Sequence, residues 1–95
     1  MTYDVSFVAG DGRGGSEIKI SDATGQACVN DCVERKKTDT RINGVTIRSN
    51  GQGGCWCERG MTYVASSRTY NTGYLREKSE LITLLLYLHI SVRRV

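Results

Sequence analysis

The sequence predicts an α+β domain in which an antiparallel β-sheet cradles a single α-helix, with two disulfides joining the helix to the sheet. Three observations support this fold class. Several short segments alternate apolar and polar residues, one stretch has helical spacing, and the four cysteines fall on the helical stretch and on one strand-like segment. The 95 residues include eleven glycines and no proline, which suits one small domain, residues 1–95, with turns made by Gly, Asn and Asp.

Two strands are predicted near the N-terminus. "TYDVSFV" at 2–8 alternates apolar and polar residues, and "EIKIS" at 17–21 does the same. The glycine-rich stretch at 9–15 separates them and is expected to be a hairpin loop, so these two strands are expected to pair with each other.

One helix is predicted over residues 24–37. Asp22 or Thr24 can cap its N-terminus, and Ala27, Cys28 and Cys32 recur at helical spacing. Lysines stand near the far end, where positive charge suits the exposed carbonyl groups.

A β-hairpin is predicted from 44–49 into 55–59. "NGQGG" at 50–54 is the strongest turn signal of the chain, and both flanking segments have strand-like composition. One or two further short strands are expected within 61–66 and 68–75.

The segment at about 76–95 is atypical and its pattern fits two structures. A leucine stripe at 81–88 has helical spacing, whereas alternate residues over 82–90 fit a strand, which we favour. The apolar run at 81–90 is roughly half of the ~20 residues that a helix needs to cross a bilayer, so no membrane span is predicted. His89, the only histidine, is expected to be a packed or surface residue.

The four cysteines are expected to form two disulfides. Cys28 and Cys32 share a helical face about 6 Å apart, and Cys55 and Cys57 share a strand face about 6.5–7 Å apart, so two bridges fit between them. The pairs Cys28–Cys57 and Cys32–Cys55 are favoured, on the assumption that helix and strand run antiparallel; a parallel run gives the other pairing. A four-cysteine zinc site is the lesser alternative, because structural zinc usually takes Cys-x2-Cys knuckles. Disulfides indicate a secreted, extracellular setting.

The run "CVNDCVERKKTDTRINGVTIRSNGQGGCWCERGM" at 28–61 resembles the PAN/apple module of extracellular proteins. The likeness lies in the Cys-x3-Cys helix, the "INGVT" strand and the hairpin that returns to the "CWCE" strand. It implies a helix disulfide-linked to an antiparallel sheet, and a module that binds carbohydrate or protein ligands. The chain departs from many members of the family in having no cysteine outside 28–57, and in its ending.

Composition and motifs argue against other functions. A net charge of +3, evenly spread, does not indicate nucleic-acid binding. The glycines at 10, 12 and 15 match a dinucleotide-binding pattern, but a strand-like segment follows where that motif needs a helix. Neither paired carboxylates nor a nucleophile motif is evident, so we expect no enzyme, no cofactor and no metal ion. A structural, self-associating protein, with a homo-oligomer formed through residues 81–92, is the alternative to a recognition module.

The candidate ligand-binding residues surround the single tryptophan. With the neighbouring cysteines facing the helix, Trp56 must face the other side of the sheet. It is either covered there by another segment, which is slightly favoured, or exposed as an aromatic platform for a sugar ring. Arg48, Arg59, Tyr63 and Tyr70 are the residues expected to join such a platform.

Overall fold

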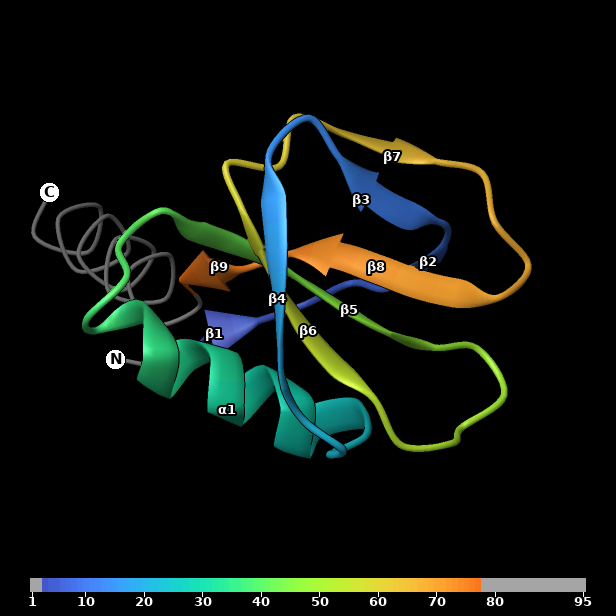
Figure 1. Ribbon diagram of the computed structural model, residues 1–95, viewed down its shortest axis with the longest axis horizontal. Helices are drawn as coiled ribbons and strands as arrows, with labels where there is room; N and C mark the ends of the chain where they lie inside the picture. The colour runs from blue at the N-terminus through green and yellow to red at the C-terminus, as the bar shows by residue number, and fades with distance from the viewer. Residues whose placement is uncertain (1–2, 78–95) are drawn as a thin grey trace, which may run out of the picture.

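The computed structural model describes residues 3–77, and within this range the chain forms one helix and nine short strands. Figure 1 shows their arrangement. The elements are β1 (Tyr3–Asp4), β2 (Val8–Ala9), β3 (Asp11–Arg13), β4 (Ser16–Ser21), α1 (Gly25–Lys36), β5 (Ile42–Arg48), β6 (Cys55–Arg59), β7 (Tyr63–Ala65), β8 (Tyr70–Tyr74) and β9 (Arg76–Glu77).

The centre of the fold is a five-stranded antiparallel sheet with the strand order β2-β8-β5-β6-β4. The strands rotate strongly across the sheet, so that β4 is nearly vertical in Figure 1 while β8 is nearly horizontal. Two smaller pairs, β1 with β9 and β3 with β7, complete the described topology. The predicted α+β class, with a single helix on an antiparallel sheet and two disulfides, is confirmed.

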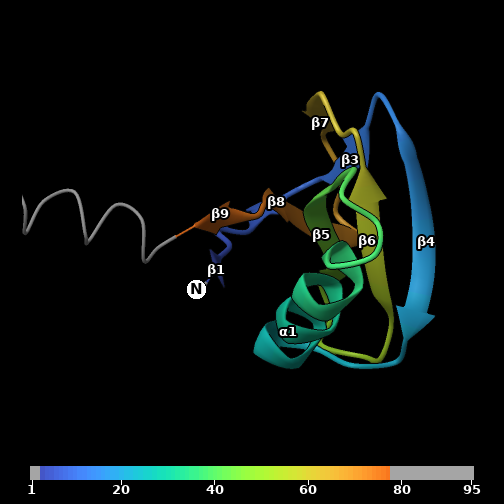
Figure 2. The same cartoon turned by 90° about the vertical axis from the view of Figure 1, so that its left-hand side faces the viewer.

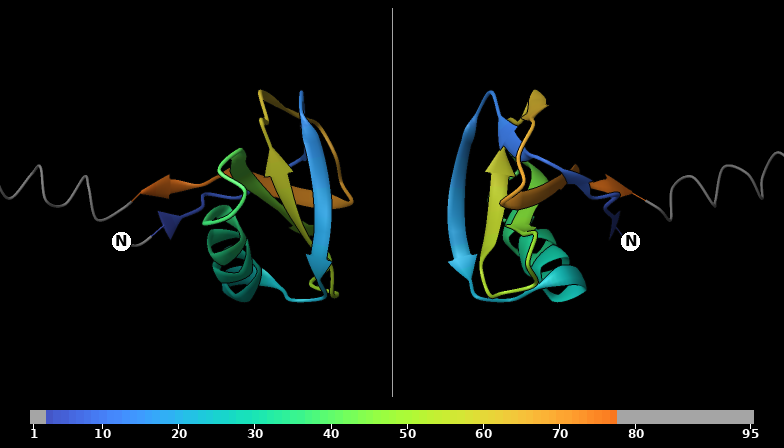
Figure 3. Two further views of the ribbon diagram at one scale, coloured as in Figure 1. Left: turned by 60° about the vertical axis from the view of Figure 1, so that its left-hand side comes forward. Right: turned by 90° about the vertical axis from the view of Figure 1, so that its right-hand side faces the viewer.

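The two faces of the sheet are covered by different elements. Helix α1 packs on one face, against β4, β5 and β6, and lies at the lower end of the molecule in Figure 2. The β3–β7 ribbon, by which we mean the paired strands β3 and β7, lies at the opposite end, where β3 contacts β5 and β8. We call the face that carries α1 the helix face and the opposite face the outer face; Figure 3 shows both from two further sides.

The predicted helix and central hairpin are both confirmed. Helix α1 begins at Gly25, after Thr24 as its N-cap, and carries Arg35 and Lys36 in its last turn. Strands β5 and β6 pair antiparallel, with Val45 opposite Cys57 and Ile47 opposite Cys55. Both elements arise from local signals, which explains why the sequence alone predicts them.

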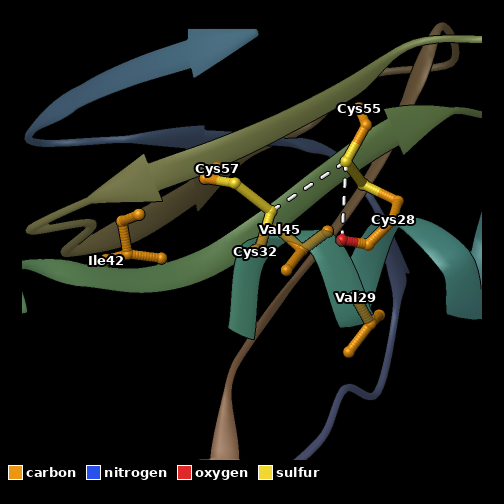
Figure 4. Close-up of a cluster of buried hydrophobic side chains, with 7 residues drawn as sticks. All are labelled: Cys28, Val29, Cys32, Ile42, Val45, Cys55 and Cys57. Atoms are coloured by element: carbon orange, nitrogen blue, oxygen red, sulfur yellow. Dashed lines mark hydrogen bonds between the residues drawn. A yellow bond between two sulfur atoms is a disulfide. The ribbon is translucent and has the colours of Figure 1, made fainter. Parts of the chain in front are cut away.

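The two disulfides are Cys28–Cys55 and Cys32–Cys57, so the favoured pairing of Cys28 with Cys57 and Cys32 with Cys55 was wrong. The reason is direction. A short loop after α1 turns β5 back antiparallel to the helix, and the hairpin turns β6 back once more, so β6 runs parallel to α1 (Figure 4). The earlier cysteine of the helix therefore meets the earlier cysteine of the strand.

The bridges also form much of the hydrophobic core. The buried apolar cluster contains all four cysteines together with Val29, Ile42 and Val45, shown in Figure 4. A core of this size stabilises a domain only modestly, so covalent links across it carry a large share of the stability.

The expected hairpin between the first two strand-like segments was wrong. Strand β4 pairs with β6, whereas β1 pairs with β9 and β2 pairs with β8. The glycine-rich stretch between them is more than a loop, because it contains β3, which pairs with β7. These partners lie far along the chain, beyond what local alternation can indicate.

The C-terminal segment lies largely outside the described residues. The question of helix or strand over 81–90, the homo-oligomer predicted through residues 81–92 and the place of His89 all fall there. Within residues 3–77, no helix is both long and apolar enough to cross a membrane.

Candidate functional site

Trp56 lies on the outer face of the sheet, as its alternation with the cysteines predicts. In the register of the sheet Trp56 stands opposite Lys19 of β4 and Thr46 of β5, and Thr46 stands opposite Thr72 of β8. Directly paired residues of antiparallel strands share a face, so these four side chains form one row across the outer face. The two threonines are buried, whereas Trp56 is half-buried and Lys19 is exposed.

The indole ring of Trp56 is held between two cations and a second aromatic ring. The guanidinium carbon of Arg48 lies 5.3 Å from the ring centroid, and Nζ of Lys19 lies 5.7 Å from it. Tyr70 meets the indole edge-on, with ring centroids 5.5 Å apart and an interplanar angle of 82°. We call Lys19, Arg48, Trp56 and Tyr70 the Trp56 patch; cation–π and aromatic contacts fix its geometry.

Two local features of the β5–β6 turn shape this patch. Gly54 has a φ of 149°, and a side chain there would place its Cβ 2.7 Å from the indole, so glycine leaves room for the ring to lie over the strand. Nε of Arg48 donates a hydrogen bond to the carbonyl oxygen of Gly53 at 3.1 Å. Among the described residues, the other N–H groups of Arg48 have no hydrogen-bond partner, so they remain available to an acceptor from solvent.

The structure brings together Trp56, Arg48 and Tyr70 but separates the two other predicted binding residues from them. Arg59 lies an even number of residues from the cysteines of β6, so its side chain is on the helix face. Its Nε donates a hydrogen bond to Asp39, which follows α1. Tyr63 lies on β7, opposite Arg13, and is 59% exposed. Proximity in sequence suggested Arg59, although the alternation of a strand places it on the opposite face from Trp56.

Lys19 completes the patch and was missed by sequence reasoning. Its only local signal is that it points away from Ile18 and Ile20 in an alternating segment. That alternation does not reveal that β4 pairs with β6, which is what sets Lys19 opposite Trp56.

Three carboxyl groups lie close together at the other end of the outer face, where no pattern in the sequence predicts a buried acid. Asp11 of β3, Glu17 of β4 and Glu58 of β6 place carboxyl oxygens within 4.8 Å of one another. Glu58 is only 3% exposed, and Oε2 of Glu58 lies 2.8 Å from the hydroxyl of Thr46. Burial, first, then a hydrogen bond with the carboxyl group of Glu17, and the negative charges of Glu17 and Asp11 raise the pKa of Glu58 to about 8, while the hydrogen bond from Thr46 acts in the opposite direction.

The four cysteines do not offer a zinc site in this structure. Three of their sulfur atoms, those of Cys28, Cys32 and Cys55, lie within 4.8 Å of one another, which is ligand-like spacing. All four sulfurs are nevertheless bonded in the two disulfides, and zinc is held by thiolates. The carboxyl cluster is better suited to holding a proton than a cation, because its central member is buried and hydrogen-bonded within the protein.

No family model, curated protein or solved structure matches the chain. The resemblance to the PAN/apple module therefore stays a prediction from the 28–61 motif. The two disulfides between helix and sheet are compatible with it and are common in extracellular proteins.

Proposed function

We propose that the protein is an extracellular, non-catalytic recognition module that binds an anionic carbohydrate at the Trp56 patch. The observation that carries this proposal is the half-buried indole of Trp56, which stands on the outer face between Arg48 and Lys19. Two disulfides in a domain of 95 residues support the oxidising setting.

The chemistry of the patch favours a sugar with a negative charge. Tryptophan and arginine are frequent anchors of binding sites, and an indole offers a flat apolar surface on which the apolar face of a sugar ring can stack. The unpaired N–H groups of Arg48 suit a carboxylate or a sulfate, because guanidinium donates two parallel hydrogen bonds to such groups. Lys19 contributes a second positive charge, only partly neutralised by its exposed ion pair with Asp22 at 3.0 Å.

A glycan array with neutral, carboxylated and sulfated sugars tests the proposal. We expect binding to the charged sugars, weakened by salt, and lost in Trp56→Ala. Tyr63→Ala is the control, because it removes a more exposed aromatic ring from outside the patch and should leave binding unchanged. Arg48→Gln should reduce the preference for charged over neutral sugars.

Two outcomes would contradict this function. The first is an array on which the folded protein binds no sugar at all. The second is equal loss of binding in Trp56→Ala and Tyr63→Ala, which would mean that the patch is not the binding surface. Circular dichroism of each variant shows that the fold is retained.

A further inference from the structure

The outer face contains a second unusual feature, which is independent of the carbohydrate proposal. The carboxyl group of Glu58 is enclosed between the sheet and the β3–β7 ribbon. On the sheet side it contacts Thr46. On the ribbon side, a Cβ added to Gly12 of β3 would lie 2.7 Å from Cδ of Glu58 and 2.6 Å from Sδ of Met61, so the backbone of β3 passes directly over the carboxyl group.

The hydrogen bonds beside Glu58 can be counted atom by atom. Glu58 contacts the hydroxyl of Thr46, the hydroxyl of Thr46 contacts that of Thr72, and the hydroxyl of Thr72 contacts the carbonyl oxygen of Val45 at 2.9 Å. Each of these three contacts joins two oxygen atoms and therefore needs one hydrogen. The two hydroxyls supply two hydrogens, and the carbonyl of Val45 supplies none.

The third hydrogen has one source, the carboxyl group of Glu58. Thr72 must donate to Val45, because a carbonyl only accepts, and Thr46 must then donate to Thr72 if that contact is to be a hydrogen bond. Thr46 donates to Glu58 when the carboxyl group is ionised, but its single hydrogen is then missing from the contact with Thr72. When Glu58 is protonated, Thr46 accepts from it and all three contacts are hydrogen bonds. The chain thus runs from the Glu58 acid through Thr46 and Thr72 to the backbone of β5, and it is complete only when Glu58 carries a proton.

The charges around Glu58 act in the same direction. Asp11 faces it from β3 and is itself paired with Arg13 at 3.2 Å, and Glu17 faces it from β4. Thr46 of β5, which contacts Glu58, and Thr72 of β8, which contacts Thr46, are uncharged. An ionised Glu58 would therefore meet two other carboxyl groups with little access to water, and its pKa is accordingly raised.

The tyrosines near this end of the outer face do not change this balance. Tyr74 of β8 lies beyond Gly44 on the outer face, and Tyr63 of β7 is highly exposed. Neither ring is a carboxyl or a basic group, so neither adds to the charges already named.

We propose that Glu58 is a neutral carboxylic acid in the folded protein at neutral pH, and that its neutral state allows the β3–β7 ribbon to lie over it. Loss of the proton at alkaline pH leaves a buried charge beneath β3 and beside Asp11 of the ribbon, so the ribbon separates from the outer face. The feature is a pH-sensitive clasp built into the fold.

Glu58→Gln separates the two protonation states. A glutamine has the same shape, keeps an N–H donor for Thr46 and cannot ionise, so it imitates the neutral acid. From about pH 5 to about pH 8, we expect the unfolding equilibrium constant of the wild type to rise by up to tenfold per pH unit relative to that of the variant. At about pH 9 the variant should be the more stable protein.

The opposite result would overturn the proposal. If Glu58 were a carboxylate that accepts a hydrogen bond from Thr46, Glu58→Gln would be less stable than the wild type at neutral and alkaline pH, with no crossover near pH 8. An NMR titration of the ¹³C carboxyl signal of Glu58 in the wild type is a second test, and it does not depend on whether a variant folds. A midpoint near that of an ordinary glutamate would also overturn the proposal.

Proteolysis tests the movement of the ribbon. Trypsin cleaves after arginine, and Arg13 lies in β3. The rate of cleavage after Arg13 in the wild type, divided by the rate in Glu58→Gln at the same pH, cancels the pH dependence of the protease. We expect this ratio to increase above about pH 8, as Glu58 ionises; a ratio that is constant with pH would mean that the ribbon stays in place.

Discussion

Removing the two disulfides one at a time should reveal that they act as a coupled pair. The bridges Cys28–Cys55 and Cys32–Cys57 span sequence separations of 27 and 25 residues. Taken alone, either closes a loop whose chain entropy corresponds to about 3.5 kcal/mol of stability. The second bridge, formed when the first is present, closes only a small ring made by the 28–32 and 55–57 segments. For a ring of about eight residues the same relation gives about 2.5 kcal/mol.

The two bridges are therefore not additive. Replacing one cysteine pair by alanines should lower the free energy of unfolding by about 2.5 kcal/mol, whichever pair is chosen, and replacing both should lower it by about 6 kcal/mol. The double removal thus exceeds the two single removals together by about 1 kcal/mol. The buried volume lost with the sulfur atoms lowers all the variants further, but it largely cancels in the comparison of the four proteins.

Urea unfolding followed by Trp56 fluorescence measures these differences. A stabilising osmolyte at the same concentration in every sample keeps the protein without bridges measurable. If each single removal lowers stability by about 3.5 kcal/mol and the two effects add, the bridges close independent loops. That result would refute the placement of the two bridges side by side, one helical turn apart on α1 and two residues apart on β6.

Three further predictions concern single residues. Between pH 4.5, the ordinary value, and about 8, the folded chain holds a proton on Glu58 that the unfolded chain has lost. Stability should therefore fall with rising pH by at most about 1.4 kcal/mol per unit, which urea titrations over this range will measure. Gly12→Ala should lower the free energy of unfolding by about 1–3 kcal/mol, because the new methyl group overlaps Glu58 and Met61; a neutral effect would contradict the close passage of β3. Asp39→Asn should destabilise the protein at neutral pH, because a hydrogen bond from Arg59 lowers the pKa of that carboxyl below its ordinary 3.8. The difference from wild type should vanish as the pH falls through that range, and thermal unfolding at neutral and acidic pH will show whether it does.

The parts of the fold that the sequence predicts are those that depend on neighbours along the chain. Helix α1 and the β5–β6 hairpin follow from helical spacing and from the "NGQGG" turn, and both are found within a few residues of the predicted bounds. The disulfide pairing could also have been predicted correctly. Counting the two reversals between α1 and β6 gives a parallel run, and a parallel run pairs Cys28 with Cys55.

The parts that the sequence does not predict depend on pairing between distant strands. Lys19 reaches Trp56, and Glu17 reaches Glu58, because β4 lies beside β6, some forty residues along the chain. Alternation indicates which residues share a face of a strand, but it does not indicate which other strand pairs with it. The burial of Glu58 requires one more non-local step, the passage of β3 over the outer face.

The elements that cover the two faces of the sheet are held there by different interactions, so the two faces should respond differently to reductant and to pH. On the helix face, α1 is joined to β6 by covalent bonds that are insensitive to pH below the range of thiol exchange and sensitive to reductant. On the outer face, the β3–β7 ribbon covers a carboxyl group whose hydrogen-bond chain depends on one proton and contains no sulfur. Reduction should therefore loosen α1 first, and alkali should loosen the ribbon first.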